Sequence, residues 1–459
     1  MTVETPKDTA PGAEDKLDFK KILPILVVVL IDLLGLTIII PLLPLYATSF
    51  GANPQTIGLL GATYPLMQLL GAPLLGRLSD RYGRKPIMIA SQIGTLIGFL
   101  VLGFANTLAI LFLARIIDGL SGANISTAQA MIADSTTEKT RTQGLGLIGA
   151  AFGLGFILGP VIAYAALALS GNDYHAPAFI AAAFSALSIV LSWFWLQETH
   201  QPGTASTGRA RAPFSFAAML RALTLPQIGL LLVLLFAQQI AFGGFEQLLA
   251  LFTLTRLGMD AADNALVFVF VGIIVVAIQG GLLGRWSRKW GDRKLIYLGL
   301  GALALGLALT ALTPHAPVPW YSQARVQTEL HSQQTQPGTV PEQLPVALPA
   351  DSDRGWAGLA WLLVAMIPAS VGGAVLQPSI NSLLTKRIRA DERGGILGVS
   401  TAFLSGANAL APLIGGAIFQ IIGPSAPFWA WAGIMAVLLL VTLWAIKPSG
   451  ESRPAPMAA

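Results

Sequence analysis

Long apolar runs separated by short charged loops constrain this chain more than any other feature. The 459 residues are 54% hydrophobic and 11% charged, whereas a soluble domain carries about 25% charged residues. No charged residue occurs from Leu33 to Gly76 or from Gly394 to Ile446. So little polar surface cannot keep the chain in water, and we therefore predict that it spans a membrane.

Turn residues within these runs set the number of spans. A helix needs about 20 apolar residues to cross a bilayer, so residues 51–54 and 423–425 each divide one run into two. Backbone groups in lipid must be paired within the protein, and runs this long and uniform lack the alternation of barrel strands. We expect an all-α membrane protein of twelve helices, near residues 22–46, 54–76, 87–106, 108–133, 143–168, 177–197, 226–253, 263–284, 295–313, 356–385, 394–421 and 426–446.

The basic residues of the loops predict the orientation. The two tails and every second loop between them together hold 24 of the 28 Lys and Arg residues. The other loops hold only Arg256, Arg325 and Arg354, and Arg115 falls within a span. Cytoplasmic loops carry such an excess. We therefore expect both termini on the cytoplasmic side of an inner or plasma membrane.

The sequence contains an internal repeat. Residues 76–86 and 284–294 share Gly, Arg, Ser and a second Gly at an offset of 208, and Pro160 matches Pro412 at an offset of 252. The offsets differ by 44, close to the 42 residues of the polar segment 314–355. We infer two homologous six-helix halves, whose interface is the usual place for a substrate site. The expected domains are a cytoplasmic tail (1–21), a first bundle (22–197), a cytoplasmic linker (198–222), a second bundle (223–446) and a cytoplasmic tail (447–459).

The polar segment 314–355 is expected to be an insertion in the second half. It is rich in Gln, Pro, Thr and Ser, a composition that favours a poorly ordered external loop. A lid or a segment that binds a partner is the alternative.

Four segments resemble a known family. Residues 76–85 read Gly-Arg-Leu-Ser-Asp-Arg-Tyr-Gly-Arg-Lys and resemble the loop between spans 2 and 3 of the major facilitator superfamily. Residues 30–44, 115–124 and 155–160 resemble motifs of the first, fourth and fifth spans in its twelve-span drug:proton antiporters of the tetracycline-efflux type. The chain departs from the fifth-span motif at Ala163-Tyr164, where that family has two glycines.

The resemblance implies the fold of that superfamily and a function. The function is proton-coupled export of drug-like or lipophilic compounds by alternating access, as in multidrug efflux and antibiotic resistance. A proton symporter that takes up a sugar or a small organic acid is the alternative.

Four charged residues are expected at bilayer depth: Asp32, Arg115, Asp118 and Glu246. A charge there costs several kcal/mol unless it is paired or lines a wet cavity, so each is a candidate for proton coupling. Asp32, in the middle of span 1, is the first candidate, because apolar surroundings favour the neutral form of a carboxyl. Permanent pairing with Arg115 is the alternative for Asp32. Arg115 and Asp118 can also pair with each other, while the resemblance implies a role in proton transfer for Arg115.

Polar residues of the second half suggest a substrate cavity. Gln239 and Phe242 share a helix face with Glu246, seven and four residues before it. An acid, an amide and an aromatic ring on one face suit an amphiphilic or cationic solute, although a solvated helix end would also explain Glu246. Further candidates for the cavity are Gln279, Gln377 and Asn381.

The loop 76–86 suggests a conformational latch. Asp80 ends span 2, where it can meet the positive N-terminus of a helix in the other half, and Arg84 can pair with Asp134. Such contacts would hold a conformation that is closed to the cytoplasm. Arg288 replaces the acid in the second copy, so we expect an asymmetric latch. The latch residues are Gly76, Asp80, Arg81, Gly83, Arg84 and Asp134, and those of the antiporter motif, expected to give close packing and a bend, are Gly155, Gly159 and Pro160.

Several classes of function are excluded. No GxxxxGK[ST] segment is present, so ATP hydrolysis is not expected. The four histidines have no ligand spacing and there is no cysteine, so we expect neither a metal site nor an enzyme. A proton gradient would take the place of a cofactor. The expected partners are a small-molecule substrate, protons and the lipid bilayer, with no nucleic acid, and the chain is expected to be a monomer.

Overall fold

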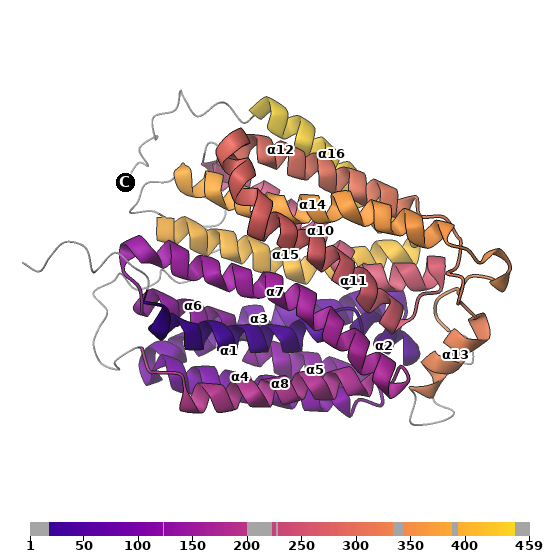
Figure 1. Ribbon diagram of the computed structural model, residues 1–459, viewed down its shortest axis with the longest axis horizontal. Coiled ribbons are helices and arrows are strands. Elements are labelled where there is room, and N and C mark those ends of the chain that lie inside the picture. Colours follow the sequence, from indigo (N-terminus) through magenta and orange to yellow (C-terminus); the bar gives the residue numbers. More distant parts are fainter. Residues whose placement is uncertain are drawn as a thin grey trace, which may run out of the picture.

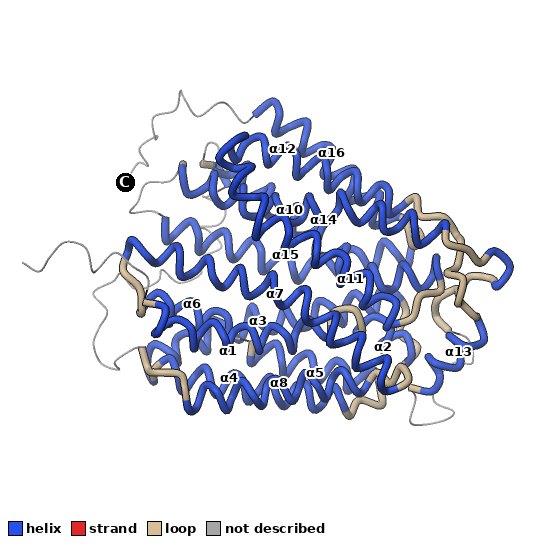
Figure 2. The backbone as a smooth tube through the Cα atoms, viewed as in Figure 1, coloured by secondary structure: helices blue, strands red, loops and turns tan. Residues whose placement is uncertain are grey.

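The computed structural model describes residues 18–122, 124–199, 223–225, 228–333, 344–387 and 393–445. Within these residues the chain forms helices joined by loops and turns, with no strand (Figure 2). The all-α membrane fold predicted from the sequence is confirmed. Nearly all of both tails and most of the linker 198–222 lie outside the described residues.

Each expected span coincides with one helix or with consecutive helices. The first half contains α1 (Phe19–Ile39), α2 (Leu43–Ser49), α3 (Pro54–Tyr82), α4 (Arg84–Gly103), α5 (Leu108–Ser121), α6 (Asn124–Asp134), α7 (Glu138–Ser170) and α8 (His175–Phe194). The second half contains α10 (Ile228–Leu257), α11 (Ala261–Val276), a π-helix (Ala277–Leu282), α12 (Leu283–Ala311), α13 (Gln323–Ser332), α14 (Ala357–Lys386), α15 (Arg393–Ile421) and α16 (Ala426–Ala445).

One apolar stretch contains two spans. Eleven stretches of helix within the described residues are long and apolar enough to cross a membrane, and one of them, Ala261–Ala311, is 51 residues long. Gly291 interrupts that stretch with a φ of +76°, a conformation outside the helical region. Because glycine adopts positive φ without steric cost, the chain can reverse here between two crossings. This break accounts for the twelfth span.

The two halves meet tightly at one end of the bundle, near α2 and α13 (Figure 1). A Cβ added to Gly58 of α3 would lie 2.2 Å from the carbonyl oxygen of Pro412 on α15, and one on Gly416 would lie 2.5 Å from that of Pro54. Backbones can approach this closely only where side chains are absent. We call this end the α13 side, and the opposite end, where α1 begins and α16 ends, the termini side (Figure 1).

The expectation of a poorly ordered loop at 314–355 is wrong for residues 314–333 and 344–355. Helix α13 lies in this segment, and its Val326 and Leu330 are each 1% exposed. The amide of Val318 also donates to the carbonyl of Leu257 at 3.0 Å. Composition was misleading because the few apolar residues are spaced four apart on one helix face, where they bury together. Residues 334–343 lie outside the described part of the chain.

Candidate functional site

Asp32 occupies a polar cluster between α1, α4 and α8. Its Oδ2 accepts a hydrogen bond from Nε2 of Gln92 at 3.3 Å, and the same Gln92 nitrogen donates to Oγ of Ser188 at 2.7 Å. The Oδ1 atom of Asp32 is buried and has no hydrogen-bond partner within the described residues. A buried acceptor without a donor is costly, so this oxygen requires a proton, a water molecule or a solute.

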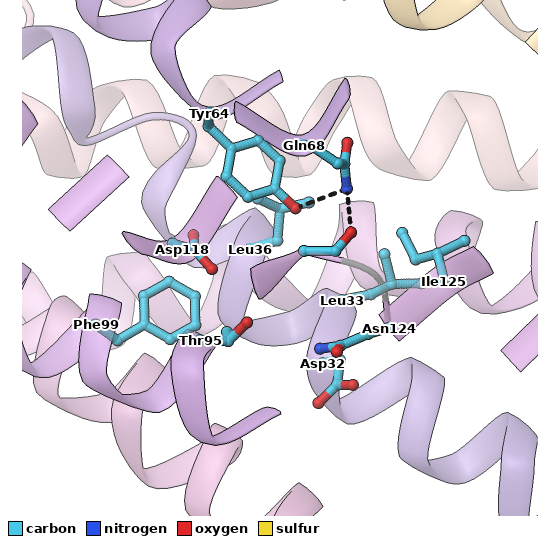
Figure 3. A pocket seen from close by; sticks show the side chains of 11 residues that line it. Asp32, Leu33, Leu36, Tyr64, Gln68, Thr95, Phe99, Asp118, Asn124 and Ile125 are labelled. Atoms are coloured by element: carbon cyan, nitrogen blue, oxygen red, sulfur yellow. Dashed lines mark hydrogen bonds between the residues drawn. The ribbon is translucent and has the colours of Figure 1, made fainter. Parts of the chain in front are cut away.

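A small cavity of about 30 Å³ adjoins Asp32. It can hold about two water molecules, whereas a drug-sized ligand needs roughly 300 Å³ or more. In this conformation the cavity therefore suits protons and water better than a bulky solute. Figure 3 shows Asn124 beside Asp32, with Asp118 and Thr95 across the cavity. The lining residues are Asp32, Leu33, Leu36, Tyr64, Gln68, Thr95, Phe99, Asp118, Gly122, Asn124 and Ile125.

The partner of Arg115 is Asp118. The two side chains form a buried ion pair one turn apart on α5, with Arg115 4% and Asp118 2% exposed. The Arg115 guanidinium also lies 5.1 Å from the ring centre of Tyr64 on α3. Asp32 is therefore bound by the side-chain amide of Gln92 and not by Arg115. The alternative of a permanent pair between Asp32 and Arg115 is not the arrangement in this structure. Because Asp118 lines the same cavity, the structure brings three of the four expected charged residues close together.

The antiporter motif packs α7 against α1. Oγ1 of Thr37, five residues after Asp32, donates to the carbonyl of Gly155 at 2.9 Å. A Cβ on Gly159 would lie 2.1 Å from that hydroxyl oxygen, so only glycine allows this approach. Pro160 lies inside the continuous helix α7. Close packing explains Gly155 and Gly159, and a role in transport stays a prediction.

The substrate-cavity candidates lie apart from the Asp32 cavity, because none of them lines it. Nε2 of Gln239 donates to Asn408 at 2.7 Å, and Nε2 of Gln279 donates to the carbonyl of Ala374 at 3.3 Å. Phe242 covers Gly373 on α14 and lies 6.0 Å from the ring of Phe245. Glu246 on α10, and Gln377 and Asn381 on α14, are half-buried. Their role in binding a substrate stays a prediction.

Arg84 is the centre of the expected latch. Its Nε lies 3.1 Å from Oδ2 of Asp134, and its Nη1 lies 2.6 Å from Oδ1 of Asp80 and 3.1 Å from Oγ of Ser79. Gly83, with a φ of +104°, separates α3 from α4 and places Arg84 at the start of α4. The pairing of Arg84 with Asp134 thus has the geometry expected from the sequence. Arg81 lies over the ring of Tyr82, and Gly76 faces open space.

Sequence reasoning missed Glu198, which lies after α8. Its carboxylate accepts the amides of Arg84 at 2.9 Å and Lys85 at 3.0 Å. Free amides and the helix dipole at the start of α4 favour such a negative charge. The cavity residues Tyr64, Gln68 and Thr95 were missed too, as was Gln92, which donates to Asp32. Their spacing was the available signal, because polar residues three or four apart in an apolar span share one helix face.

A bundle of membrane-spanning helices that holds a buried cluster of ionisable side chains is typical of a membrane transporter. The chain belongs to the Major Facilitator Superfamily, whose family model matches residues 25–324 and 346–459. The match omits residues 325–345, which include most of α13.

Curated relatives extend along most of the chain. The class E tetracycline resistance protein of Escherichia coli is 34% identical over 64% of this chain and 73% of its own length. The class C protein of Escherichia coli is 29% identical over 94% of this chain and 97% of its own length. Multidrug resistance protein 1 of Bacillus subtilis (strain 168) is 26% identical over 90% of this chain and 93% of its own length.

Solved structures share the fold. The nucleoside transporter NupG superposes with a TM-score of 0.67 at 14% identity, covering 94% of this chain and all of the other. The human organic anion transporter MFSD10 superposes with a TM-score of 0.57 at 21% identity, covering 92% of this chain and 99% of the other. At these identities the likeness extends to the fold alone.

Proposed function

We propose that this protein exports drug-like or lipophilic small molecules in exchange for protons. It does so by alternating access, as a multi-pass protein of the inner or plasma membrane with both termini in the cytoplasm. The similarity to tetracycline and multidrug resistance proteins over most of the chain supports this substrate class. In this orientation the tight contact of the halves on the α13 side closes the protein to the outside.

One observation carries the proposal. The carboxyl of Asp32 lies inside a membrane helix, in a cavity with room for water, with one oxygen lacking a hydrogen-bond donor. Ionised, this carboxyl demands water or a cation, and protonated, it is neutral and its new O–H can bond locally. Taking up or losing a proton therefore changes which conformation of the surrounding helices is favoured. A drug gradient and a proton gradient can be coupled through such a group.

The test is proton-driven accumulation of tetracycline in inverted membrane vesicles. Asp32→Asn should abolish accumulation, while tetracycline binding to the purified protein persists. Asp18→Asn, which changes an exposed carboxyl just before the same helix, is the matched control and should leave accumulation unchanged. Full accumulation by Asp32→Asn would overturn the assignment.

The direction of proton movement relative to the solute distinguishes the proposed exporter from the alternative, a proton symporter. A proton symporter that imports a sugar or a small acid would move its solute together with protons. Imposing an outward gradient of tetracycline, a sugar or a small acid in turn and recording vesicle pH distinguishes the two. The solute that drives a proton flux identifies the substrate class, and the sign of that flux separates exchange from co-transport.

A further inference from the structure

Helix α13 joins the two halves of the molecule on the α13 side. The segment before it is fixed to the second half, where Nε1 of Trp320 donates to both carboxylate oxygens of Asp263 at 3.1 and 3.0 Å. The helix itself packs on α2 of the first half, with Val326 and Leu330 buried. A segment that belongs to one half thus lies on the other.

Four hydrogen bonds connect α13 and its C-cap residue to the loop between α7 and α8. Glu329 accepts from Nδ2 of Asn172 at 3.1 Å and from the hydroxyl of Tyr174 at 2.9 Å. Gln333 accepts from the amide of Tyr174 at 2.9 Å and donates to the carbonyl of Asn172 at 2.9 Å. Both backbone and side-chain groups of the loop are engaged, so the docking has a defined register.

Asp260 ties this contact to the second half as well. It is the N-cap residue of α11, and its Oδ2 accepts from Nδ2 of Asn172 and from Nη2 of Arg325, each at 3.2 Å. Asn172 has a φ of +64°, which is uncommon for a residue other than glycine. The loop belongs to the first half and is therefore held in an unusual conformation by side chains of the second half.

We propose that α13 is a strap that holds the α13 side closed, and that it leaves the α7–α8 loop each time that side opens. Its contacts cross between the halves, and two halves that rock apart must break them. The family model matches the chain on both sides of residues 325–345 but not within them, so the strap is an addition to the family's shared framework. The opening step rests on the alternating access proposed above, whereas the docking of α13 does not.

Thiol labelling tests the docking without any substrate. The chain has no cysteine, so Val326→Cys places a single thiol under the strap, where a membrane-impermeant maleimide reaches it only when α13 lifts. Glu329→Ala removes two hydrogen bonds, from Asn172 and Tyr174, and should speed this labelling by about tenfold or more. Gln327→Ala, on the exposed face of α13, should leave the rate unchanged. Tyr174→Phe changes only the loop and should also speed labelling. Equal rates in all variants, or rapid labelling of Val326→Cys alone, would overturn the docking.

Cross-linking tests the movement. Asn172→Cys with Gln333→Cys, joined by a short thiol-reactive cross-linker that a reducing agent cleaves, should stop proton-driven tetracycline accumulation, and reduction should restore it. Asp263→Cys with Trp320→Cys joins two sites of the second half and should leave transport intact. Cross-link formation is followed as the loss of free thiol. Undiminished transport by the fully cross-linked first pair would overturn the opening step. An absence of tetracycline transport before cross-linking would instead count against the proposed function, while the labelling result still stands.

Discussion

Lys386 at the end of α14 pairs with Asp292 at 2.5 Å, and this pair repeats, with its charges reversed, the pair between Arg84 and Asp134. The offset of 208 that relates the two loop motifs carries Arg84 to Asp292, and the offset of 252 that relates Pro160 to Pro412 carries Asp134 to Lys386.

The serine of the motif takes part in both halves. Ser79 accepts from Arg84 at 3.1 Å, and Ser287 donates to Asp292 at 2.6 Å. Both halves thus have a charge pair and a serine at corresponding positions. The loop residue of the pair is basic in the first half (Arg84) and acidic in the second (Asp292). Lys386 and the hydrogen bonds from Ser287 and Ser382 lower the pKa of Asp292 below its usual value, against the opposing effect of burial. Arg288 occupies the position in the second half that corresponds to Asp80 in the first. The two loops therefore differ in charge at this position, while the charge pair and the serine are kept.

The reversed pair should stabilise the second half. Lys386→Ala leaves the buried carboxylate of Asp292 without its cation, and because Lys386 is largely exposed the expected cost is only about 1 kcal/mol. The exchange Asp292→Lys with Lys386→Asp should recover part of this loss. Thermal unfolding of the detergent-purified protein measures both variants. An unchanged transition midpoint in Lys386→Ala would show that the pair contributes nothing.

The latch should control turnover and not selectivity. Asp80→Asn removes the charge that lies 2.6 Å from Arg84, so we expect the latch proposed for this loop to become weaker. We expect a turnover several-fold lower, with the same ranking of transported compounds, and Asp18→Asn as the unaffected control. Competition between labelled compounds in inverted vesicles measures the ranking, and a changed ranking would contradict a purely mechanical role.

Gly58 should determine whether the α13 side can close. A methyl group at this position would lie 2.2 Å from the carbonyl oxygen of Pro412, and backbone cannot move aside cheaply. Gly58→Ala should therefore favour the conformation that is open on the α13 side and raise the labelling rate of Val326→Cys. Gly433→Ala is the matched control, since a Cβ there meets nothing within 4 Å. Equal labelling in the two variants would show that the halves close without this contact.

The strap should respond to external pH. Burial raises the pKa of Glu329 from 4.5 to about 7, and Asp260 adds to the rise, while Tyr174, Asn172 and Arg325 act against it. The docked state therefore binds the proton more tightly than free α13 does. Docking is strongest below about pH 4.5 and weakens as the pH rises towards 7, beyond which it levels off.

Labelling of Val326→Cys between pH 5 and pH 8 measures this response, after correction for the reactivity of a free thiol. The rate should rise with pH by about tenfold or more. Glu329→Gln cannot titrate and should remove the rise. A rise that persists in Glu329→Gln would assign the response to another group.

Helix positions could be predicted from the sequence because bilayer thickness fixes the length of each apolar run. The break at Gly291 falls between the expected spans 263–284 and 295–313 and was predicted. The break at Gly122, inside the expected span 108–133, was not, since it depends on tertiary contacts. Gln68, for example, donates to the carbonyl of Gly122 at 2.8 Å from another helix. Helix α13 was missed because its stability comes from docking onto α2 and the α7–α8 loop, neither of which its own composition reveals.

The charged residues of the site could also be predicted, because each is expensive in lipid. The hydrogen-bond and ion-pair partners of these charged residues could not be predicted from the sequence. Whether Asp32 meets Arg115 or Gln92 depends on the rotation of α1 and α4 about their axes, and no single helix encodes that. Glu198 was missed for a similar reason, because its binding site consists of backbone amides of α4 that carry no side-chain signature.

Every residue that lines the Asp32 cavity belongs to the first half of the chain. Under the proposed function, proton coupling through Asp32 and recognition of a solute by the second half can therefore change independently over evolutionary time. A chimera that kept residues 18–199 and took its second bundle from a relative would inherit the same energy source while acquiring different cargo.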